Sequence, residues 1–145
     1  MTPLDVANKA RELEGVRFRK YGRELKHGID CIGVPIWVGQ ELGLIGSVHI
    51  PPYTFPPEPA LFDELLPRFV DEIETVEVGA IIILNGEKSG RPQHCAIIVP
   101  AIYTGNLHCI GAMMMPSRAF IGEFKLSAAT LSRLHKVYRY RGLAS

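Results

Sequence analysis

A cysteine at position 31 lies where a glycine-containing loop leads into an apolar segment, in the stretch KHGIDCIGVPIW (residues 26–37). If Gly28 or Asp30 ends the loop and Cys31 begins a helix, the sulfur lies near unpaired backbone N–H groups and the positive end of the helix dipole. Both favour the thiolate, which is the nucleophilic form, so the segment predicts covalent catalysis once a base is close. Pro35 predicts an irregular helix start. The alternative is that Cys31 is a small buried hydrophobic residue.

Two histidine–cysteine pairs on expected strands supply candidate bases. They are His94–Cys95 in QHCA and His108–Cys109 in LHCI. Successive strand residues point to opposite faces, so each pair sends its histidine one way and its cysteine the other. If both histidines face the helix that carries Cys31, folding brings together a cysteine and a histidine, the minimum nucleophile–base unit. The other two cysteines would then be core or outer-face residues and not nucleophiles.

The same residue types leave two other arrangements open. Three cysteines and five histidines could hold zinc, although the sequence has no CxxC or HxxxH spacing. Cys95 and Cys109 could instead form a disulfide across neighbouring strands, which would say little about activity. Because three cysteines are too few and odd in number for a disulfide framework, we expect at least one free thiol.

The elements that must position these groups change type along the chain. Helical patterns are predicted over 3–14 and 36–42, followed by a proline-dense surface loop over 50–59. A third helix is predicted over 60–76, kinked or split at Pro67.

From residue 78 onward the chain has short β-rich runs separated by Gly, Pro and Asn. The predicted strands are 78–84, 94–100, 106–112, 118–124 and 136–142. A short helix over 127–136 is predicted between the last two. Helices first and a meander of strands afterwards predict an α+β fold, with N-terminal helices packed on a small antiparallel sheet.

Composition predicts one globular domain over residues 1–145. Hydrophobic residues make up 47% of the chain, charged residues 21%, and the formal net charge is +1. This balance gives no electrostatic argument for nucleic acid or an anionic membrane as a partner. No apolar run is long enough to cross a bilayer, and the N-terminus indicates a capped helix and not an export signal.

Taken together, these segments resemble the NlpC/p60 superfamily of papain-like cell-wall peptidases, and within it the short bacteriophage branch associated with tail tips. The resemblance runs nearly end to end. EGVRFRKYGRELKHGIDCIGV resembles the segment that leads into the nucleophile, ELGL the end of its helix, RPQHCAIIV the base strand and VYRYRGL the C-terminal strand. The most specific part is the conjunction of Gly-x-Asp-Cys with Pro-x-His on a following strand and the Arg-Tyr-Arg-Gly ending.

The resemblance implies a papain-like domain with Cys31 as nucleophile and His94 as the general base, which takes the thiol proton and later protonates the leaving amine. The implied substrate is bacterial peptidoglycan, cut in its stem peptide next to a D-amino acid, commonly between D-glutamate and a diamino acid. The backbone N–H of Cys31 is then the expected donor to the oxyanion. No metal or organic cofactor is implied.

Some positions depart from the family pattern. The third polar residue, usually a histidine that orients the base, has an Ile-His-Ala context, and here the string IGA puts Gly111 in that slot. His108 is the candidate orienter if the chain turns near Pro100, whereas a turn at TGN would leave it too far from His94. Phe18 stands where the family often has tyrosine. These departures leave an alternative open, a catalytically weak or inactive tail-tip structural protein that keeps the peptidase fold.

The resemblance also implies partners and a location. A virion would carry the chain at the phage tail tip to the host cell wall or periplasm, where local cleavage of peptidoglycan lets the tail pass. The partner proteins would be tail hub or baseplate components, with no nucleic acid and no membrane insertion. The apolar, proline-rich loop from Tyr53 to Pro59 is the candidate contact with them. A host-encoded amidase or acyltransferase on the same fold is a further alternative, with the same nucleophile and base and a different substrate.

Overall fold

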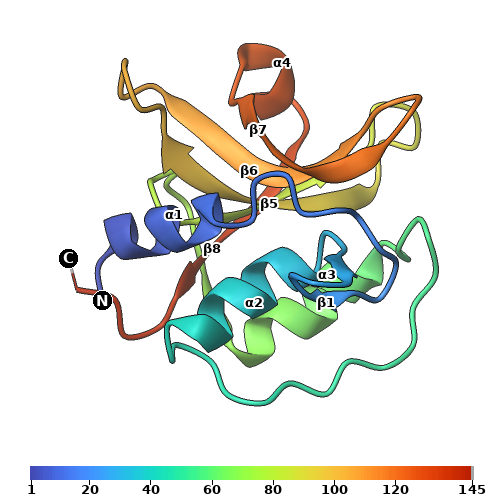
Figure 1. Ribbon diagram of the computed structural model, residues 1–145, viewed down its shortest axis with the longest axis horizontal. Helices are drawn as coiled ribbons and strands as arrows, with labels where there is room; N and C mark the ends of the chain where they lie inside the picture. Colours follow the sequence, from blue (N-terminus) through green and yellow to red (C-terminus); the bar gives the residue numbers. More distant parts are fainter. Residues whose placement is uncertain (145) are drawn as a thin grey trace.

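The computed structural model describes residues 1–144 and contains a main antiparallel sheet of six strands. The strands lie in the order β3-β8-β4-β5-β6-β7 (Figure 1). They are β3 (Val70–Ile73), β4 (Ile81–Asn85), β5 (Pro92–Pro100), β6 (Leu107–Met114), β7 (Ala119–Lys125) and β8 (Leu134–Tyr140). All five predicted strands are present and the helices precede most of them, so the predicted α+β fold class is confirmed.

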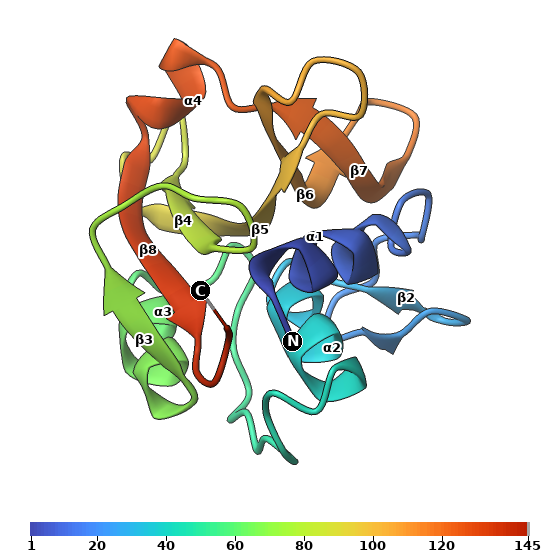
Figure 2. The same ribbon diagram turned by 90° about the vertical axis from the view of Figure 1, so that its left-hand side faces the viewer.

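Three helices cover one face of this sheet (Figure 1). They are α1 (Pro3–Arg11), α2 (Gly33–Glu41) and α3 (Ala60–Leu65). Figure 2 shows α1 between α2 and the middle of the sheet. The short α4 (Ala128–Leu131) joins β7 to β8 and lies on the other side in Figure 1. Among the described residues, no helix is both long and apolar enough to cross a membrane.

The first helix forms where the sequence predicts it. Thr2 and Asp5 bond each other's backbone N–H groups in a capping box, and Pro3 occupies the first helical position. Val6 and Ala10 face the core and are fully buried. The helix thereby supplies an apolar layer on which β5 and α2 pack.

Two apolar clusters lie on the two faces of the sheet. The larger one, on the helix-covered face, includes Cys31 and Cys95, whereas the smaller one includes Ala96 and Cys109. Ile98 is the direct partner of Cys109 in the β5–β6 ladder, so Cys109 shares the face of Ala96 and Ile98 while Cys95 points the other way. The cross-strand disulfide is therefore excluded, and all three cysteines are free.

The prediction of a helix over 60–76 is correct only for residues 60–65 and wrong beyond them. The helix ends in a single 3-10 turn around Pro67, and the chain then enters β3, whose Val70 pairs with Tyr140 of β8. Pro67 removes a helical donor, and pairing with β8 satisfies the backbone of residues 70–73 instead. A strand of four residues is too short for its alternation to be told from a helical face.

The helix predicted over 127–136 is also too long. Ser127 caps it as expected, but it ends at Leu131 and β8 begins at Leu134. Residues 134–136 pair with β4 and so belong to the sheet.

A small hairpin joins the Cys31 segment to the main sheet. β1 (Arg23–Glu24) pairs with β2 (Gly28–Ile29), which leads directly into the turn before α2. The extended segment 16–18 runs between β2 and β7, with Phe18 paired to Ile29 and Arg17 paired to Phe120. This connection ties the turn before α2 to the edge of the sheet.

Candidate active site

Cys31 lies in the turn that precedes α2. The helix begins at Gly33, two residues later than expected, and Pro35 falls in its first turn, where a backbone N–H is not needed for helical bonding. The Tyr140 hydroxyl donates a hydrogen bond of 2.6 Å to the Pro35 carbonyl and ties α2 to β8. The Cys31 side chain is only 5% exposed, but it lines two cavities.

The residue before this cysteine, Asp30, holds the turn with a fully buried carboxylate. Its Oδ1 accepts hydrogen bonds of 2.8 Å from the backbone N–H of Gly33 and from the Arg23 guanidinium. Its Oδ2 accepts bonds from the Tyr21 backbone N–H, at 2.9 Å, and from the Tyr53 hydroxyl. A buried carboxylate is tolerated when it is paired and hydrogen-bonded in this way. The network fixes the start of α2 and with it the position of the thiol.

Burial, followed by the negative charge of Asp30, raises the pKa of Cys31 to about 12. The backbone N–H groups of Cys31 and Ile32 act in the opposite direction and are outweighed. The prediction that the helix start favours the thiolate is therefore wrong, because it considered the donors and not the loss of solvent. The resting site holds a neutral thiol, which needs a base to become a nucleophile.

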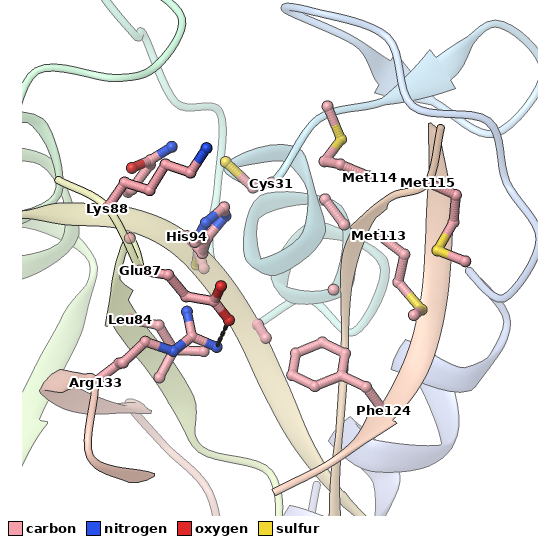
Figure 3. Close-up of a pocket in the computed structure, with 16 residues that line it drawn as sticks. Cys31, Leu84, Glu87, Lys88, His94, Met113, Met114, Met115, Phe124 and Arg133 are labelled. Carbon is pink, nitrogen blue, oxygen red and sulfur yellow. Dashed lines mark ion pairs between the residues drawn. The ribbon is translucent and has the colours of Figure 1, made fainter. Parts of the chain in front are cut away.

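His94 lies at the start of β5, where the sheet has a β-bulge. Its neighbour Gln93 is left out of the pairing with β4 as the extra residue, and bulges re-aim nearby side chains. By strand alternation the imidazole leaves the sheet on the face opposite to Cys95, whereas His108, opposite Val99, lies on the Cys95 face. The condition that both histidines face the helix that carries Cys31 is therefore not met. His94 nevertheless lines the same two cavities as Cys31, as Figure 3 shows for the larger one.

The surroundings of His94 favour the neutral form of its imidazole. Burial lowers its pKa below the usual range, the positive charge of Arg133 lowers it further, and Glu87 acts in the opposite direction. Arg133 and Glu87 form an ion pair beside it, with Nη2 and Oε1 4.0 Å apart (Figure 3). A neutral imidazole can accept a proton, so His94 and the Cys31 thiol have complementary protonation states for nucleophile activation.

The two cavities share Cys31 and His94 as lining residues. The larger cavity, of about 710 Å³, is lined by charged side chains on one side and by methionines 113–115 on the other. The smaller one, of about 290 Å³, is lined mainly by apolar groups, including Phe18 and Phe55. A chain laid across both would pass over the two reactive groups, with polar surroundings on one side and apolar surroundings on the other. This arrangement is suited to attack by the thiol on a bound carbonyl.

Comparison with solved structures shows which proteins share this architecture. The chain superposes on a Staphylococcus aureus protein described as similar to a lipoprotein of the NLP/P60 family, with a TM-score of 0.61 and 18% sequence identity over 99% of this chain. It superposes on the NlpC/p60 domain of the peptidoglycan hydrolase SagA with a TM-score of 0.55 and 13% identity, over 94% of this chain and 97% of that domain. The chain has the NlpC/p60 fold. The predicted papain-like architecture is thereby confirmed.

These matches are matches of fold. The chain spans only 42% of the length of the staphylococcal protein. No protein-family model matches the sequence, and no curated protein matches it significantly.

In this NlpC/p60 fold, the slot for a third polar residue is closed. Gly111 pairs with Ala96 on β5, and a Cβ added at position 111 would lie 2.9 Å from the Ala96 Cβ and 3.4 Å from the Phe124 ring. The space for an orienting side chain is thus taken by Ala96 and Phe124. No residue at position 111 could orient His94 without displacing them.

His108, the other candidate orienter, lies far from His94. The chain turns over 101–106, so His108 is opposite Val99, five residues along β5 from His94. At about 3.4 Å per residue this separation is about 17 Å. His108 instead bonds Glu123, with Nδ1 and Oε2 2.7 Å apart, and lines neither of the two cavities. The expectation that His108 orients His94 is therefore wrong.

Several contributors to the site were missed by sequence reasoning. Arg133 and Glu87 are charged residues at the end of a short helix and in a turn, and no motif marks either of them. Phe124 follows the ordinary alternation of a strand. Asp30 did carry a signal, because it directly precedes Cys31.

Within residues 1–144, no cluster of three or more His, Cys, Asp or Glu side chains could hold a metal ion.

Replacing Arg133 with glutamine is expected to raise the pKa of His94, because it removes a positive charge that disfavours the imidazolium. The rate of an activity that needs neutral His94 would then fall, on the acid side of its pH profile, at a higher pH than in the wild type. Glu87→Gln should move the same fall to lower pH. NMR titration of the His94 imidazole in a Cys31→Ala background measures both shifts, and movement of the two variants in the same direction would contradict this assignment.

Proposed function

We propose that the chain is a phage tail-associated cell-wall peptidase that hydrolyses peptidoglycan stem peptides with Cys31 and His94. The observation that carries the proposal is the meeting of the Cys31 thiol and the His94 imidazole on two shared cavities. The SagA domain of the same fold belongs to a peptidoglycan hydrolase, which supports peptidoglycan as the substrate class.

The first half of the proposed reaction forms a thioester. His94 takes the proton of the Cys31 thiol while Sγ attacks the carbonyl carbon of the scissile amide, and the carbonyl electron pair moves to oxygen. The backbone N–H of Cys31 is the proposed donor to this oxyanion. The imidazolium then gives its proton to the leaving nitrogen, the C–N bond breaks, and the amine departs.

The second half restores the enzyme with water. His94 takes a proton from a water molecule, whose oxygen attacks the thioester carbonyl. The C–S bond then breaks, Cys31 regains a proton from the imidazolium, and the acyl fragment leaves as a carboxylic acid. The chemistry needs no metal or organic cofactor, since thiol, imidazole and water supply every atom transferred.

Delivery by a phage tail is supported by the sequence segments around Cys31 and His94, which resemble the tail-tip branch. The proposed location is the virion tail tip, with action at the host cell wall or periplasm, and the proposed partners are hub or baseplate proteins.

The loop from Tyr53 to Pro59 is a weaker candidate for the contact with these partners than the sequence indicates. Tyr53 and Phe55 pack on Phe18 and Tyr21 of the same chain.

A second candidate function is a tail-tip structural protein with feeble or no peptidase activity. The observation that favours it is the closed slot at Gly111, where Phe124 stands in place of an orienting side chain. This candidate predicts that peptidoglycan is bound and not cut.

Digestion of purified peptidoglycan, with mass spectrometry of the released fragments, separates the two functions. The wild-type chain is expected to release fragments whose new amino and carboxyl termini flank one stem-peptide bond next to a D-amino acid. Cys31→Ala should lower the release by about a thousandfold or more, because it removes the thiol that forms the proposed thioester. Equal release from both proteins would end the peptidase proposal.

A further inference from the structure

Three arginines lie together on one side of the strand pair that ties the Cys31 segment to β7. Arg17 pairs with Phe120, and the Phe18 N–H bonds the Ala119 carbonyl at 3.0 Å. Continuing this antiparallel register brings Arg19 opposite Arg118, just past the last hydrogen bond. Alternation then puts the side chains of Arg17, Arg19 and Arg118 on the same side as Phe120.

Contacts within the chain agree with this placement. The Arg118 guanidinium lies 4.1 Å from the centre of the Phe120 ring. A Cβ added at Gly28 would meet the Arg19 Cβ at 2.7 Å and the Arg17 Cγ at 2.9 Å, so the stems of both arginines lie over this glycine. Only a glycine on β2 leaves them that room.

No carboxylate balances this set, which we call the arginine face. All three arginines are exposed, and within residues 1–144 none lies within 4.0 Å of an acidic side chain. By register the acidic residue on this side is Glu24, which pairs with Gly28 and lies one strand further out on β1. Its Oε2 lies 3.7 Å from Nε2 of His27. Like charges directly opposite each other on neighbouring strands are destabilising, so the arrangement gains from an external anion.

The arginine face borders the proposed active site. Phe120 pairs with Met113, whose side chain lines the larger cavity, and a Cβ added at Gly122 would touch both of them. Lys20, the residue after Arg19, lines the smaller cavity. A polymer held on the arginine face would therefore lie next to the groove that receives the peptide.

We propose that Arg17, Arg19 and Arg118 bind successive phosphodiester groups of an anionic cell-wall polymer and hold the chain on its substrate. The proposal rests on the proposed wall function for the source of the ligand. The guanidinium fork matches phosphate oxygens in two-point contacts. Because the face is exposed, one small anion would be screened by salt, whereas a polymer with repeated charges gains from several contacts at once.

The test is co-sedimentation of the Cys31→Ala chain with Gram-positive sacculi, before and after hydrofluoric acid removes their phosphodiester polymers. The Arg17→Gln, Arg19→Gln, Arg118→Gln triple variant is expected to bind untreated sacculi about tenfold more weakly at 50 mM salt, a difference that shrinks at high salt. Arg118→Gln alone, which leaves the segment over Gly28 unchanged, should bind about threefold more weakly.

The matched control removes the same charge from exposed sites elsewhere, as Arg68→Gln, Arg91→Gln, Lys125→Gln, and should bind like the parent. Equal loss in both triple variants would overturn the proposal, as would full binding to acid-treated sacculi or tighter binding to duplex DNA. The binding assay uses the Cys31→Ala chain and does not measure cleavage. If the wild-type chain cuts no peptidoglycan in the digestion assay while the binding results above hold, the proposed function is refuted and the proposal for the arginine face is not.

Discussion

The His94→Ala variant is expected to lower kcat/KM for peptidoglycan cleavage by about two to four orders of magnitude. With a Cys31 pKa of about 12, the thiolate is negligible at pH 7 unless a base takes the proton during attack. Among the described residues no second histidine lines either cavity, so no other imidazole can take over as the base. The loss should appear in kcat more than in KM, because the imidazole acts in the transition state.

The matched control for this variant is His108→Ala. His108 bonds Glu123 about 17 Å along the sheet from His94, so its loss should leave the cleavage rate close to that of the wild type. Circular dichroism spectra of both variants show whether each is folded. A His94→Ala protein that is folded and keeps more than a tenth of the wild-type rate would refute the role given to this histidine.

The Asp30→Ala variant is expected to lose about 3–5 kcal/mol of unfolding free energy. The substitution removes the fully buried carboxylate that pairs with the Arg23 guanidinium and accepts hydrogen bonds from the Gly33 and Tyr21 backbone N–H groups. Urea unfolding followed by circular dichroism measures this loss. Asp30→Asn, which keeps the shape and two acceptor positions, should lose less.

Asp71→Ala provides the comparison for an aspartate on the surface. Asp71 pairs with Arg141 at 2.9 Å, but both side chains are about half exposed or more, so this pair is expected to contribute little. If Asp30→Ala and Asp71→Ala change the unfolding midpoint equally, the Asp30 network does not hold the turn before α2 in the way described.

The strands could be predicted because each is long enough to show its pattern. Residues 81–84 and 95–99 are unbroken apolar runs between turn residues, and both became central strands buried on both faces. The four residues of β3 could not be predicted, since their pairing partner lies at the other end of the sequence. Only the tertiary fold reveals that Val70 faces Tyr140.

The site was predictable as a set of residue types and not as an environment. The meeting of Cys31 and His94 followed from the family resemblance, and both do line the same cavities. The sign of the thiol pKa shift could not be predicted, because the donors at a helix start are visible in sequence whereas desolvation is not. The position of His108 depended on one turn, and its placement over 101–106 separated the two histidines.

The most direct test of the central claim is mass spectrometry of the wild-type chain, quenched in acid during turnover of a stem-peptide substrate. The mass is measured on the intact chain and on its proteolytic peptides. A thiol nucleophile activated by His94 predicts an added mass equal to the acyl fragment, on the peptide that contains Cys31 and absent from Cys31→Ala. An adduct on Cys95 or Cys109, or undiminished turnover by Cys31→Ala, would contradict it.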